Sequence, residues 1–382
     1  MWWILMVLII LQWNARSLIE NGQEFKKCIS DGSFTPQVIC IQEIWLKPHL
    51  KFVLQGYTAV RRDRKVGNGG GVVTFIKTDI AYKQVNVREE CESVIVEVWS
   101  GSQKIRIINF YNPCKRLNSE TLTNIGGEGS HSEVWCGDFN AHNTLWGSEH
   151  TDHNGRAVEE LLEMKNLVCI NDGSYTRLDI SKSKYSAIDL TIMSECLAKD
   201  SVWKVLEKNL IGSDHFPLYC KIGLEVSKTD IERVPRWKIK AADWNAFQCE
   251  CEPRLQSLNS NIDDVEQYNN TICEILCEVA EDVIGKSIGR QKKKNVPWWT
   301  DECSKVVKTR NRLLRRVKKS YSFDDFIAYK RAQAAVRKVI RVAKRKHWRE
   351  YCDRIGENVD ISDVWGMIRK MEMSFESAFK CD

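Results

Sequence analysis

The sequence predicts an α/β sandwich followed by a mainly helical, basic extension. Strand-like apolar segments recur with helical segments between some of them, and polar side chains repeatedly follow those strands. The character of the chain changes at about residue 226, after which the pattern is mostly helical. Helices are expected there at 242–258, 263–285, 299–320, 324–350 and 360–371. A chain of 382 residues is also long for one domain. We therefore expect a sandwich domain over residues 1–225, a linker over 226–240 and a helical, basic connector over 241–382.

The first strand-like segment, Trp2 to Leu11, is apolar throughout and could be read as a signal peptide or a membrane anchor. It has no basic residues before it and no small-residue cleavage site, and a membrane span needs about 20 apolar residues. A continuous run of Ile, Leu and Val is also typical of a strand that is buried on both faces. The sequence thus favours a buried strand.

Further strands are predicted along the first domain, and most of them end in polar residues. We expect strands at residues 38–41, 72–76, 93–99, 104–110, 134–136, 167–170, 186–192 and 219–222. A helix is expected at 156–165. The polar residues beside these strands are Asn14, Glu43, Tyr111, Asp138, Asn140, Asp189, Asp214 and His215. Such a pattern predicts a site at one rim of the sheets.

These side chains suit phosphate chemistry with a hard metal ion. Acidic oxygen ligands without cysteine or paired histidines favour Mg²⁺, or Mn²⁺, over zinc. Asp138 and Asn140 are two residues apart, so on an extended backbone both point to one side and can orient a water molecule. Asp189 lies within an apolar strand, where it could orient His215 and raise its basicity. A surface turn after a buried strand would give a similar pattern around Asp138.

The cysteine content indicates a reducing compartment. The 15 cysteines are odd in number and lie mostly in apolar runs, with no CxxC pair and no zinc spacing. Free thiols in this number are typical of the nucleus and the cytoplasm, so we expect a protein that is not secreted.

The basic charge is concentrated late in the chain. The net charge is +6, yet residues 286–349 carry 22 basic residues against 4 acidic ones. This segment indicates a polyanionic partner, although a solvated face on a helical bundle is the competing interpretation. The residues that we expect to contact nucleic acid are Arg16, His142, Arg61, Arg62, Lys292, Lys293 and Lys294. A structural role for His142 fits its sequence position equally well.

The motifs QWN, QE, FYNP, GDFNAH, IDLT and SDHFPL occur in this order over residues 4–223. In this order they resemble the endonuclease/exonuclease/phosphatase superfamily, which includes the apurinic endonucleases and type I deoxyribonuclease. The run WCGDFNAHNTLWGS is similar to the endonuclease of jockey-type non-LTR retrotransposons. The resemblance implies a four-layer, DNase I-like α/β sandwich. It also implies a Mg²⁺-dependent endonuclease that nicks DNA and leaves a 3′-hydroxyl for reverse transcription.

The resemblance also implies residue roles. Glu43 matches the principal metal ligand, and Asn14 and Asp214 match residues beside the metal. Asp138 matches the acid that orients or deprotonates water, and Asn140 its phosphate-binding partner. Tyr111 matches a tyrosine beside the scissile phosphate, and His215 a phosphate-contacting or base histidine held by Asp189. The sequence leaves open whether Asp138 or His215 removes the proton.

The extension resembles the connector that precedes the reverse transcriptase in such elements, through VPWWTDEC at residues 296–303 and the basic helices after it. No polymerase motif follows before Asp382, so we expect a truncated copy that cannot copy RNA, with DNA and the element's RNA as candidate partners. Two other functions are compatible with the sequence. The protein could be a catalytically silent product that only binds nucleic acid through its basic helices, or a phosphatase on lipid or inositol phosphates. The GDFNAH motif and the basic extension disfavour the phosphatase.

Overall fold

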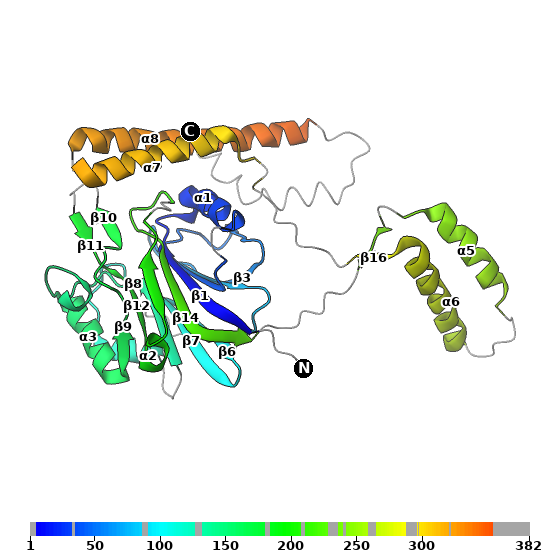
Figure 1. Ribbon diagram of the computed structural model, residues 1–382, viewed down its shortest axis with the longest axis horizontal. Coiled ribbons are helices and arrows are strands. Elements are labelled where there is room, and N and C mark those ends of the chain that lie inside the picture. Colours follow the sequence, from blue (N-terminus) through cyan, green and yellow to red (C-terminus); the bar gives the residue numbers. More distant parts are fainter. Residues whose placement is uncertain are drawn as a thin grey trace. The chain divides into compact units, whose positions relative to one another are not determined.

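The computed structural model describes residues 5–353 apart from 33–34, 86–90, 127–131, 180–183, 208–210, 228–235, 240–241, 259–264, 288–295, 297 and 321. Its contacts divide the chain into two compact units, one of Met1–Thr229 with Lys294–Asp382 and one of Asp230–Lys293. This grouping differs from the expected single connector over 241–382, because the helices after residue 294 contact the sandwich (Figure 1). The predicted helix at 360–371 lies outside the described residues.

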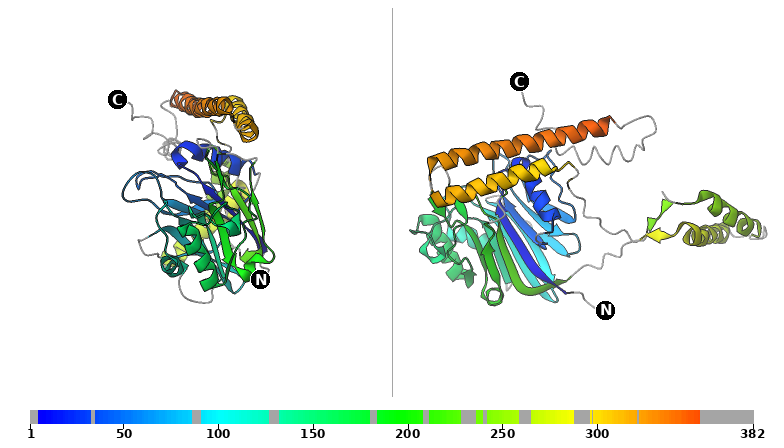
Figure 2. Two further views of the ribbon diagram at one scale, coloured as in Figure 1. Left: turned by 90° about the vertical axis from the view of Figure 1, so that its left-hand side faces the viewer. Right: turned by 45° about the horizontal axis from the view of Figure 1, so that its top comes forward.

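The larger unit is built around two mixed six-stranded sheets (Figures 1 and 2). The first has the order β13 (Val202–Val205), β14 (Leu218–Ser227), β1 (Leu5–Asn14), β2 (Val38–Gln42), β4 (Val72–Lys77) and β3 (Tyr57–Arg62). The second has the order β5 (Tyr82–Val85), β6 (Glu92–Ser100), β7 (Gln103–Tyr111), β8 (Ser132–Asp138), β12 (Asp189–Ser194) and β9 (Leu167–Cys169). The predicted α/β sandwich is confirmed.

The two sheets pack face to face, and helices cover both outer faces. The two faces of β1 pack in different hydrophobic clusters. Leu8 and Ile10 lie between the sheets, while Leu11 and Trp13 pack against α1 (Leu18–Ser30). Both faces of β1 are therefore buried, which explains its unbroken apolar run and confirms the predicted strand. On the second sheet, α2 (Ser119–Gly126) and α3 (His153–Lys165) cover the outer face. The result is a four-layer arrangement.

Strand register brings the chemically important residues to one edge of the second sheet. Tyr111 at the end of β7 pairs with Asp138 at the end of β8, which runs parallel to it. Asp138 in turn pairs with Asp189 of the antiparallel strand β12. Asp189 thus begins a strand, and the sequence-based expectation that it lies in the middle of one is wrong. The structure ends the short strand β11 (Lys184–Ser186) before it.

A glycine allows close packing beside this edge. A β-carbon on Gly137 would lie 2.0 Å from the carbonyl oxygen of Phe110 on the neighbouring strand. Gly137 also accepts a hydrogen bond from the buried side chain of Gln12, which links the two sheets at 2.9 Å. The residue before Asp138 therefore has to be glycine for β7 and β8 to approach as they do.

A long helical hairpin completes the larger unit. Helices α7 (Asp301–Ser320) and α8 (Phe323–Cys352) pack along each other and against the sandwich (Figure 2). The predicted helices at 299–320 and 324–350 are confirmed. The remaining small elements of this unit are the strand β10 (Arg177–Asp179), which pairs with β11, the helix α4 (Glu195–Ala198) and a 3-10 turn at Thr144–Trp146.

The smaller unit consists mainly of two helices, α5 (Trp244–Gln256) and α6 (Val265–Val279). A π-helical turn at Ala280–Ile284 follows α6, and two short strands, β15 (Arg236–Trp237) and β16 (Lys286–Ser287), pair in antiparallel fashion. The helices predicted at 242–258 and 263–285 are confirmed. Among the described helices of both units, none combines the length and the apolar composition that crossing a bilayer requires.

Candidate active site

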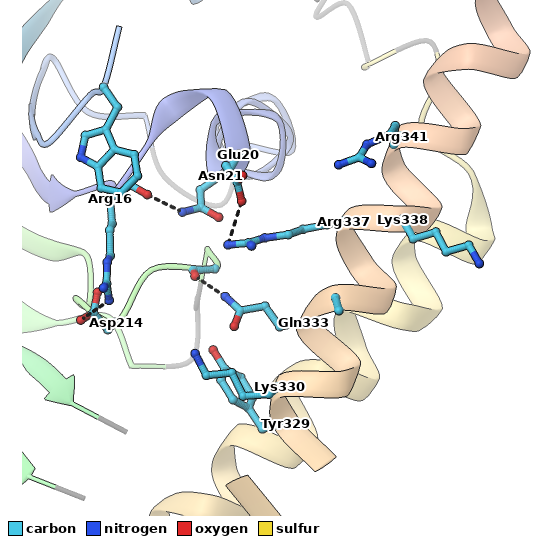
Figure 3. Close-up of a pocket in the computed structure, with 13 residues that line it drawn as sticks. Arg16, Glu20, Asn21, Asp214, Tyr329, Lys330, Gln333, Arg337, Lys338 and Arg341 are labelled. Atoms are coloured by element: carbon cyan, nitrogen blue, oxygen red, sulfur yellow. Dashed lines mark hydrogen bonds and ion pairs between the residues drawn. The ribbon is translucent and has the colours of Figure 1, made fainter. Parts of the chain in front are cut away.

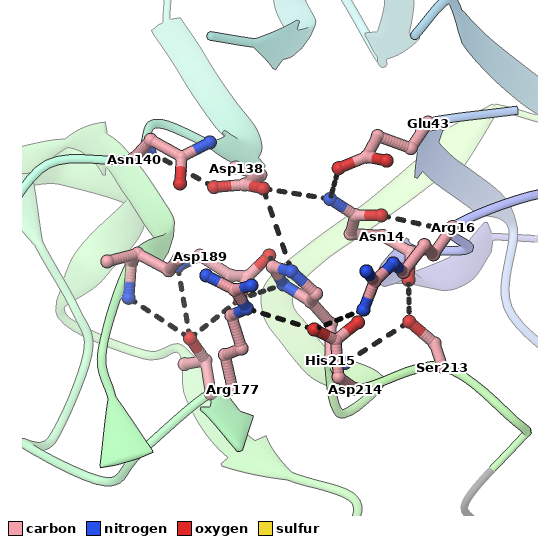
Figure 4. Close-up of polar contacts among 12 residues, drawn as sticks. Asn14, Arg16, Glu43, Asp138, Asn140, Arg177, Asp189, Ser213, Asp214 and His215 are labelled. Carbon is pink, nitrogen blue, oxygen red and sulfur yellow. Dashed lines mark hydrogen bonds and ion pairs between the residues drawn. The ribbon is translucent and has the colours of Figure 1, made fainter. Parts of the chain in front are cut away.

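His215 is held at the rim by a buried carboxylate. Its Nδ1 lies 3.0 and 2.8 Å from the two carboxylate oxygens of Asp189. Thr176 fixes that carboxylate by donating its hydroxyl to Oδ2 at 2.7 Å. With Nδ1 committed to Asp189, the Nε2 of His215 faces Asp138, 3.9 Å from its Oδ2 (Figure 4). The sequence-based expectation that Asp189 orients His215 agrees with this geometry.

Asp138 and His215 have shifted acidities that suit different roles. Complete burial, followed by the charge of Asp189, raises the pKa of Asp138 well above the usual carboxyl range. Burial opposes the charge of His215, but the carboxylates of Asp189, Asp138 and Asp214 outweigh it and raise the pKa of His215 to about 9. The imidazole therefore holds its proton at neutral pH, while Asp138 is a more basic carboxylate than an exposed aspartate.

Two carboxylates converge on the amide of Asn14 beside this pair. The Nδ2 of Asn14 donates to Oε1 of Glu43 at 3.0 Å and to Oδ2 of Asp138 at 2.8 Å (Figure 4). The Oε2 of Glu43 accepts from the indole of Trp45. Oxygen donors gathered without a thiolate are the ligands that a hard divalent cation prefers, so these residues fit such an ion.

The three ligand atoms of Asp138, Asp189 and His215 also lie within 4.8 Å of one another, a spacing that could hold a metal ion. Both oxygens of Asp189 are already engaged by His215. The carboxylate of Glu43, beside Asn14, stays the predicted principal metal ligand, and Asp138 the predicted water-directing acid.

Tyr111 lies beside Glu43 and Asp138, and the side chain of Arg64 lies over its ring. The guanidinium of Arg64 lies 5.8 Å from the centre of the Tyr111 ring. Glu92 fixes Arg64 by accepting from its Nε at 2.6 Å, and its other oxygen accepts from the backbone of Gly71. Burial, then the charges of Glu43 and Asp138, raises the pKa of Tyr111, so the phenol stays protonated and can donate a hydrogen bond.

Asp214 is engaged by two arginines. Its Oδ2 accepts from Arg16 at 2.9 Å and from Arg177 at 3.1 Å (Figure 4). Burial alone would raise the pKa of Asp214, but His215, Arg16 and Arg177 together hold it below its usual value. The metal role that the resemblance implies for Asp214 remains a prediction, and its carboxylate already has cationic partners in this structure.

Three rim residues have left-handed backbone conformations that are uncommon outside glycine. Arg16, Glu43 and Asn140 have φ angles of 44°, 48° and 44°. Asn140 is held there by contacts on both sides, because its backbone nitrogen donates to Asp138 and its side chain to the carbonyl of Asn112. Strained residues of this kind cluster at functional sites, where the surrounding structure holds them.

The described residues among those expected to contact nucleic acid lie on different segments of the sandwich. His142 stacks on His150 with ring centres 5.0 Å apart and is half-buried. The guanidinium of Arg61 binds the carbonyls of Lys47, Pro48 and Leu50, so it fixes that loop. Arg62 is half-buried at the end of β3. Lys292, Lys293 and Lys294 lie outside the described residues.

Sequence reasoning missed three contributors to the site: Arg64, Thr176 and Arg177. Arg64 was visible as part of the basic run at 61–65, but nothing in that run distinguishes it from Arg61 and Arg62. Thr176 and Arg177 carry no sequence signal, because their role depends on the isolated pairing of Arg177 with His215. Only the folded chain brings them beside Asp189 and Asp214.

Comparison with known proteins agrees with this site. Residues 105–219 match the model of the endonuclease-reverse transcriptase family, and this segment includes Tyr111, Asp138, Asp189 and His215. The matched segment is similar to that family. The resemblance to retrotransposon endonucleases is thus confirmed.

A curated relative extends the family likeness over most of the chain. It is the probable RNA-directed DNA polymerase from transposon BS of Drosophila melanogaster, which is 25% identical over 383 residues. The match covers 95% of this chain, and the chain spans 40% of that relative's length.

Solved structures are similar over the sandwich. The endonuclease domain of TRAS1, a telomere-specific non-LTR retrotransposon, is 20% identical and matches with a TM-score of 0.48, covering 57% of this chain and 99% of that domain. The AP endonuclease of Leishmania major is 15% identical with a TM-score of 0.45, covering 56% and 87%.

Proposed function

We propose that the protein is a Mg²⁺-dependent endonuclease that nicks DNA and leaves a 3′-hydroxyl. The observation that carries this proposal is the pairing of Asp138 and His215 across 3.9 Å at the rim, with Glu43 and Asn14 beside them. A phosphodiester placed there would meet a basic carboxylate, a protonated imidazole and a set of oxygen ligands. These are the parts that hydrolysis of a phosphate ester requires.

The raised pKa values assign different roles to Asp138 and His215. His215 keeps its proton at neutral pH because Asp189 stabilises the imidazolium, so it donates a hydrogen bond to a non-bridging phosphate oxygen. The P–O3′ bond breaks as water attacks phosphorus, and the leaving 3′-oxygen takes a proton from solvent. Asp138 is the more basic acceptor and takes the proton of the attacking water. Glu43, with Asn14 beside it, would hold the metal ion, which would supply charge neutralisation of the phosphate.

Neighbouring side chains complete the phosphate site. Tyr111 retains its phenolic proton and donates to a non-bridging oxygen, with Arg64 above the ring adding positive charge. Asn140, fixed by Asn112 and Asp138, faces the same rim. The family match and the basic helices support DNA as the substrate rather than a soluble phosphoester.

Supercoiled plasmid incubated with Mg²⁺ tests the proposal. We expect conversion to the nicked form by the natural protein and a loss of rate of about 10²–10⁴-fold in Asp138→Asn and in His215→Ala, the usual range for proton-transfer residues. Glu160→Gln, an exposed acid on α3, is the matched control and should retain full rate. Equal rates in the two site variants and the control would refute the assigned roles.

The same plasmid reports the chemistry of the nick and the binding-only alternative. Incorporation of labelled nucleotides by a DNA polymerase without phosphatase treatment would support a 3′-hydroxyl end. A requirement for phosphatase would contradict it. If the natural protein binds DNA in a salt-dependent way but leaves the plasmid supercoiled with Mg²⁺ and with Mn²⁺, the catalytically silent interpretation holds instead.

A further inference from the structure

The helical hairpin is fastened to the sandwich by a buried ion pair. The guanidinium of Arg310 in α7 is 1% exposed and makes two hydrogen bonds to the carboxylate of Glu24 in α1, at 2.7 and 2.6 Å. A buried charge without a partner is costly, so this bidentate pair specifies where α7 lies. An apolar cluster of Leu178, Phe216, Leu314, Val317 and Tyr329 reinforces the same contact.

This contact falls on the loop that carries the catalytic histidine. Phe216, which follows His215, packs in the cluster with Tyr329 of α8. Two residues before Asp214, the carbonyl of Gly212 accepts a hydrogen bond from Gln333 of α8 at 2.8 Å. Helix α8 therefore borders the rim of the candidate active site and contacts both sides of the Asp214–His215 pair.

Between α8 and the rim lies a groove of about 780 Å³ (Figure 3). One side of it is formed by Arg16, Trp45 and Asp214, which are close to or part of the candidate site. The other side is formed by α8, whose basic residues recur on one helix face at Lys330, Arg337, Lys338 and Arg341. The groove thus adjoins the candidate site through Arg16 and Asp214.

The positive charge of this wall is only partly compensated. Arg337 pairs with Glu20 at 2.9 Å, and Asp214 is shared by Arg16 and Arg177. Lys338 and Arg341 are exposed. Among the described residues, neither side chain forms an ion pair. The groove is therefore lined by two cationic side chains, Lys338 and Arg341, that have no acidic partner among the described residues.

We propose that this groove binds the sugar-phosphate backbone of duplex DNA on one side of the scissile bond, with Lys338 and Arg341 as phosphate contacts. The inference rests on the proposed nuclease function, because the strand held at His215 is the polyanion that must continue into an adjoining groove. In this arrangement α8 is part of the substrate-binding surface of the enzyme. It lengthens the DNA tract that the sandwich alone would contact, and it positions the duplex without touching the reacting atoms.

Binding of a duplex oligonucleotide to the full chain, in an Asp138→Asn background without cleavage, tests the groove directly. The double variant Lys338→Gln/Arg341→Gln should weaken binding and reduce the slope of log K against log salt by about 2, since each substitution leaves one phosphate without its cation. The control pair Arg331→Gln/Lys346→Gln removes the same charge from exposed positions of α8 that do not line the groove. It should leave the slope within a few tenths of the parent value.

A third variant separates the effect of lost charge on DNA binding from an effect of misfolding. Lys338→Arg/Arg341→Lys keeps both positive charges and should retain parental binding, and all three variants should unfold at the parental temperature because the changed side chains are exposed. In the cleavage-competent chain, the double glutamine variant should raise KM several-fold and leave kcat unchanged. A slope equal to that of the control pair would overturn the proposal even if plasmid nicking is normal.

The outcomes distinguish this inference from the proposed function. Loss of nicking in Asp138→Asn together with an unaltered slope in the glutamine variant refutes the groove and leaves the nuclease intact. A reduced slope in a protein that never nicks supports the groove as a DNA surface and refutes the nuclease. If the glutamine variant loses affinity for a single-stranded RNA of equal length and not for duplex DNA, the groove serves RNA and the proposal fails.

Discussion

At the scale of single residues, the site depends on the protonation state of the His215 imidazole. Asp189 fixes the Nδ1 proton of His215, and Thr176 fixes Asp189. Acting through His215, both are positioning residues, and their removal should alter the protonation of the imidazole more than the binding of substrate.

Replacing Asp189 by asparagine tests this role. The neutral amide keeps the shape but no longer stabilises the imidazolium, so the pKa of His215 should fall and the basic limb of the pH–rate profile should move to lower pH. We expect at least a 10²-fold loss of kcat at neutral pH with little change in KM. Thr176→Ser, which retains the hydroxyl, should keep the natural profile. An unshifted basic limb in Asp189→Asn would contradict the assignment.

The raised pKa of His215 also predicts how stability depends on pH. Because its pKa is raised from 6.5 to about 9 in the folded protein, the protonated form is favoured by folding. This contribution is fully present below about pH 6.5 and is lost as the pH rises through about 9. The difference in unfolding free energy between the natural protein and His215→Ala should therefore shrink from pH 6 to pH 9.5. A constant difference in urea titrations across this range would argue against a folded-state imidazolium.

At the scale of elements, strand pairing positions the site, and Gly137 is the tightest point of that pairing. A methyl group there would meet the Phe110 carbonyl at 2.0 Å, so Gly137→Ala should force β7 and β8 apart. We expect a loss of about 1–3 kcal/mol in unfolding free energy and reduced nicking, because Tyr111 and Asp138 end these strands. Gly101→Ala, where the added atom meets open space, gives the cost of backbone strain alone, because Gly101 has a φ of 58° and Gly137 is not left-handed. Equal losses in both variants would show that the close approach is not limiting.

The elements were largely predictable because their signals are local. The apolar run that forms β1 and the polar residues at the ends of β7 and β8 follow from strand periodicity and burial. At the start of α8, the Ser322 side chain makes no capping hydrogen bond. The buried Asp325 instead accepts from Ser320 and pairs with Arg316, which local patterns do not specify.

The roles of individual arginines were not predictable in the same way. Arg61 and Arg64 lie three residues apart in one basic run, yet the first binds loop carbonyls and the second lies over Tyr111. The charge of the run indicates a polyanion-binding surface, but only tertiary contacts decide which side chain is available. The docking of α7 was hidden for the same reason, since Glu24 and Arg310 are 286 residues apart.

At the scale of the whole molecule, the larger unit is assembled from both ends of the chain. The helices after residue 294 cover Glu24, which is buried under Arg310. A chain ended after residue 227 would expose the apolar residues Leu178 and Phe216 and leave Glu24 without its partner. Its melting temperature should be several degrees lower than that of the full chain, on the scale expected for a loss of a few kcal/mol.

A second truncated variant separates the causes of that loss. Adding Glu24→Gln to the shortened chain removes the unpaired charge and should recover part of the melting temperature, whereas the same substitution in the full chain should be destabilising because it leaves Arg310 unpaired. Differential scanning calorimetry of the four proteins gives the coupling between the truncation and the substitution. Additive effects would contradict a specific ion pair between the two segments.

The Glu24–Arg310 pair has a consequence for exchanging parts between related proteins. A hybrid that combines this sandwich with the helical hairpin of a related protein would need a basic residue at the position of Arg310 to pair with Glu24. It would also need apolar residues that pack against Phe216. An acid there would place two like charges in a buried contact and would withdraw the helix from the loop that carries His215. Compatibility at one interior contact thus limits which hairpins can be grafted onto this sandwich, however well each half folds alone.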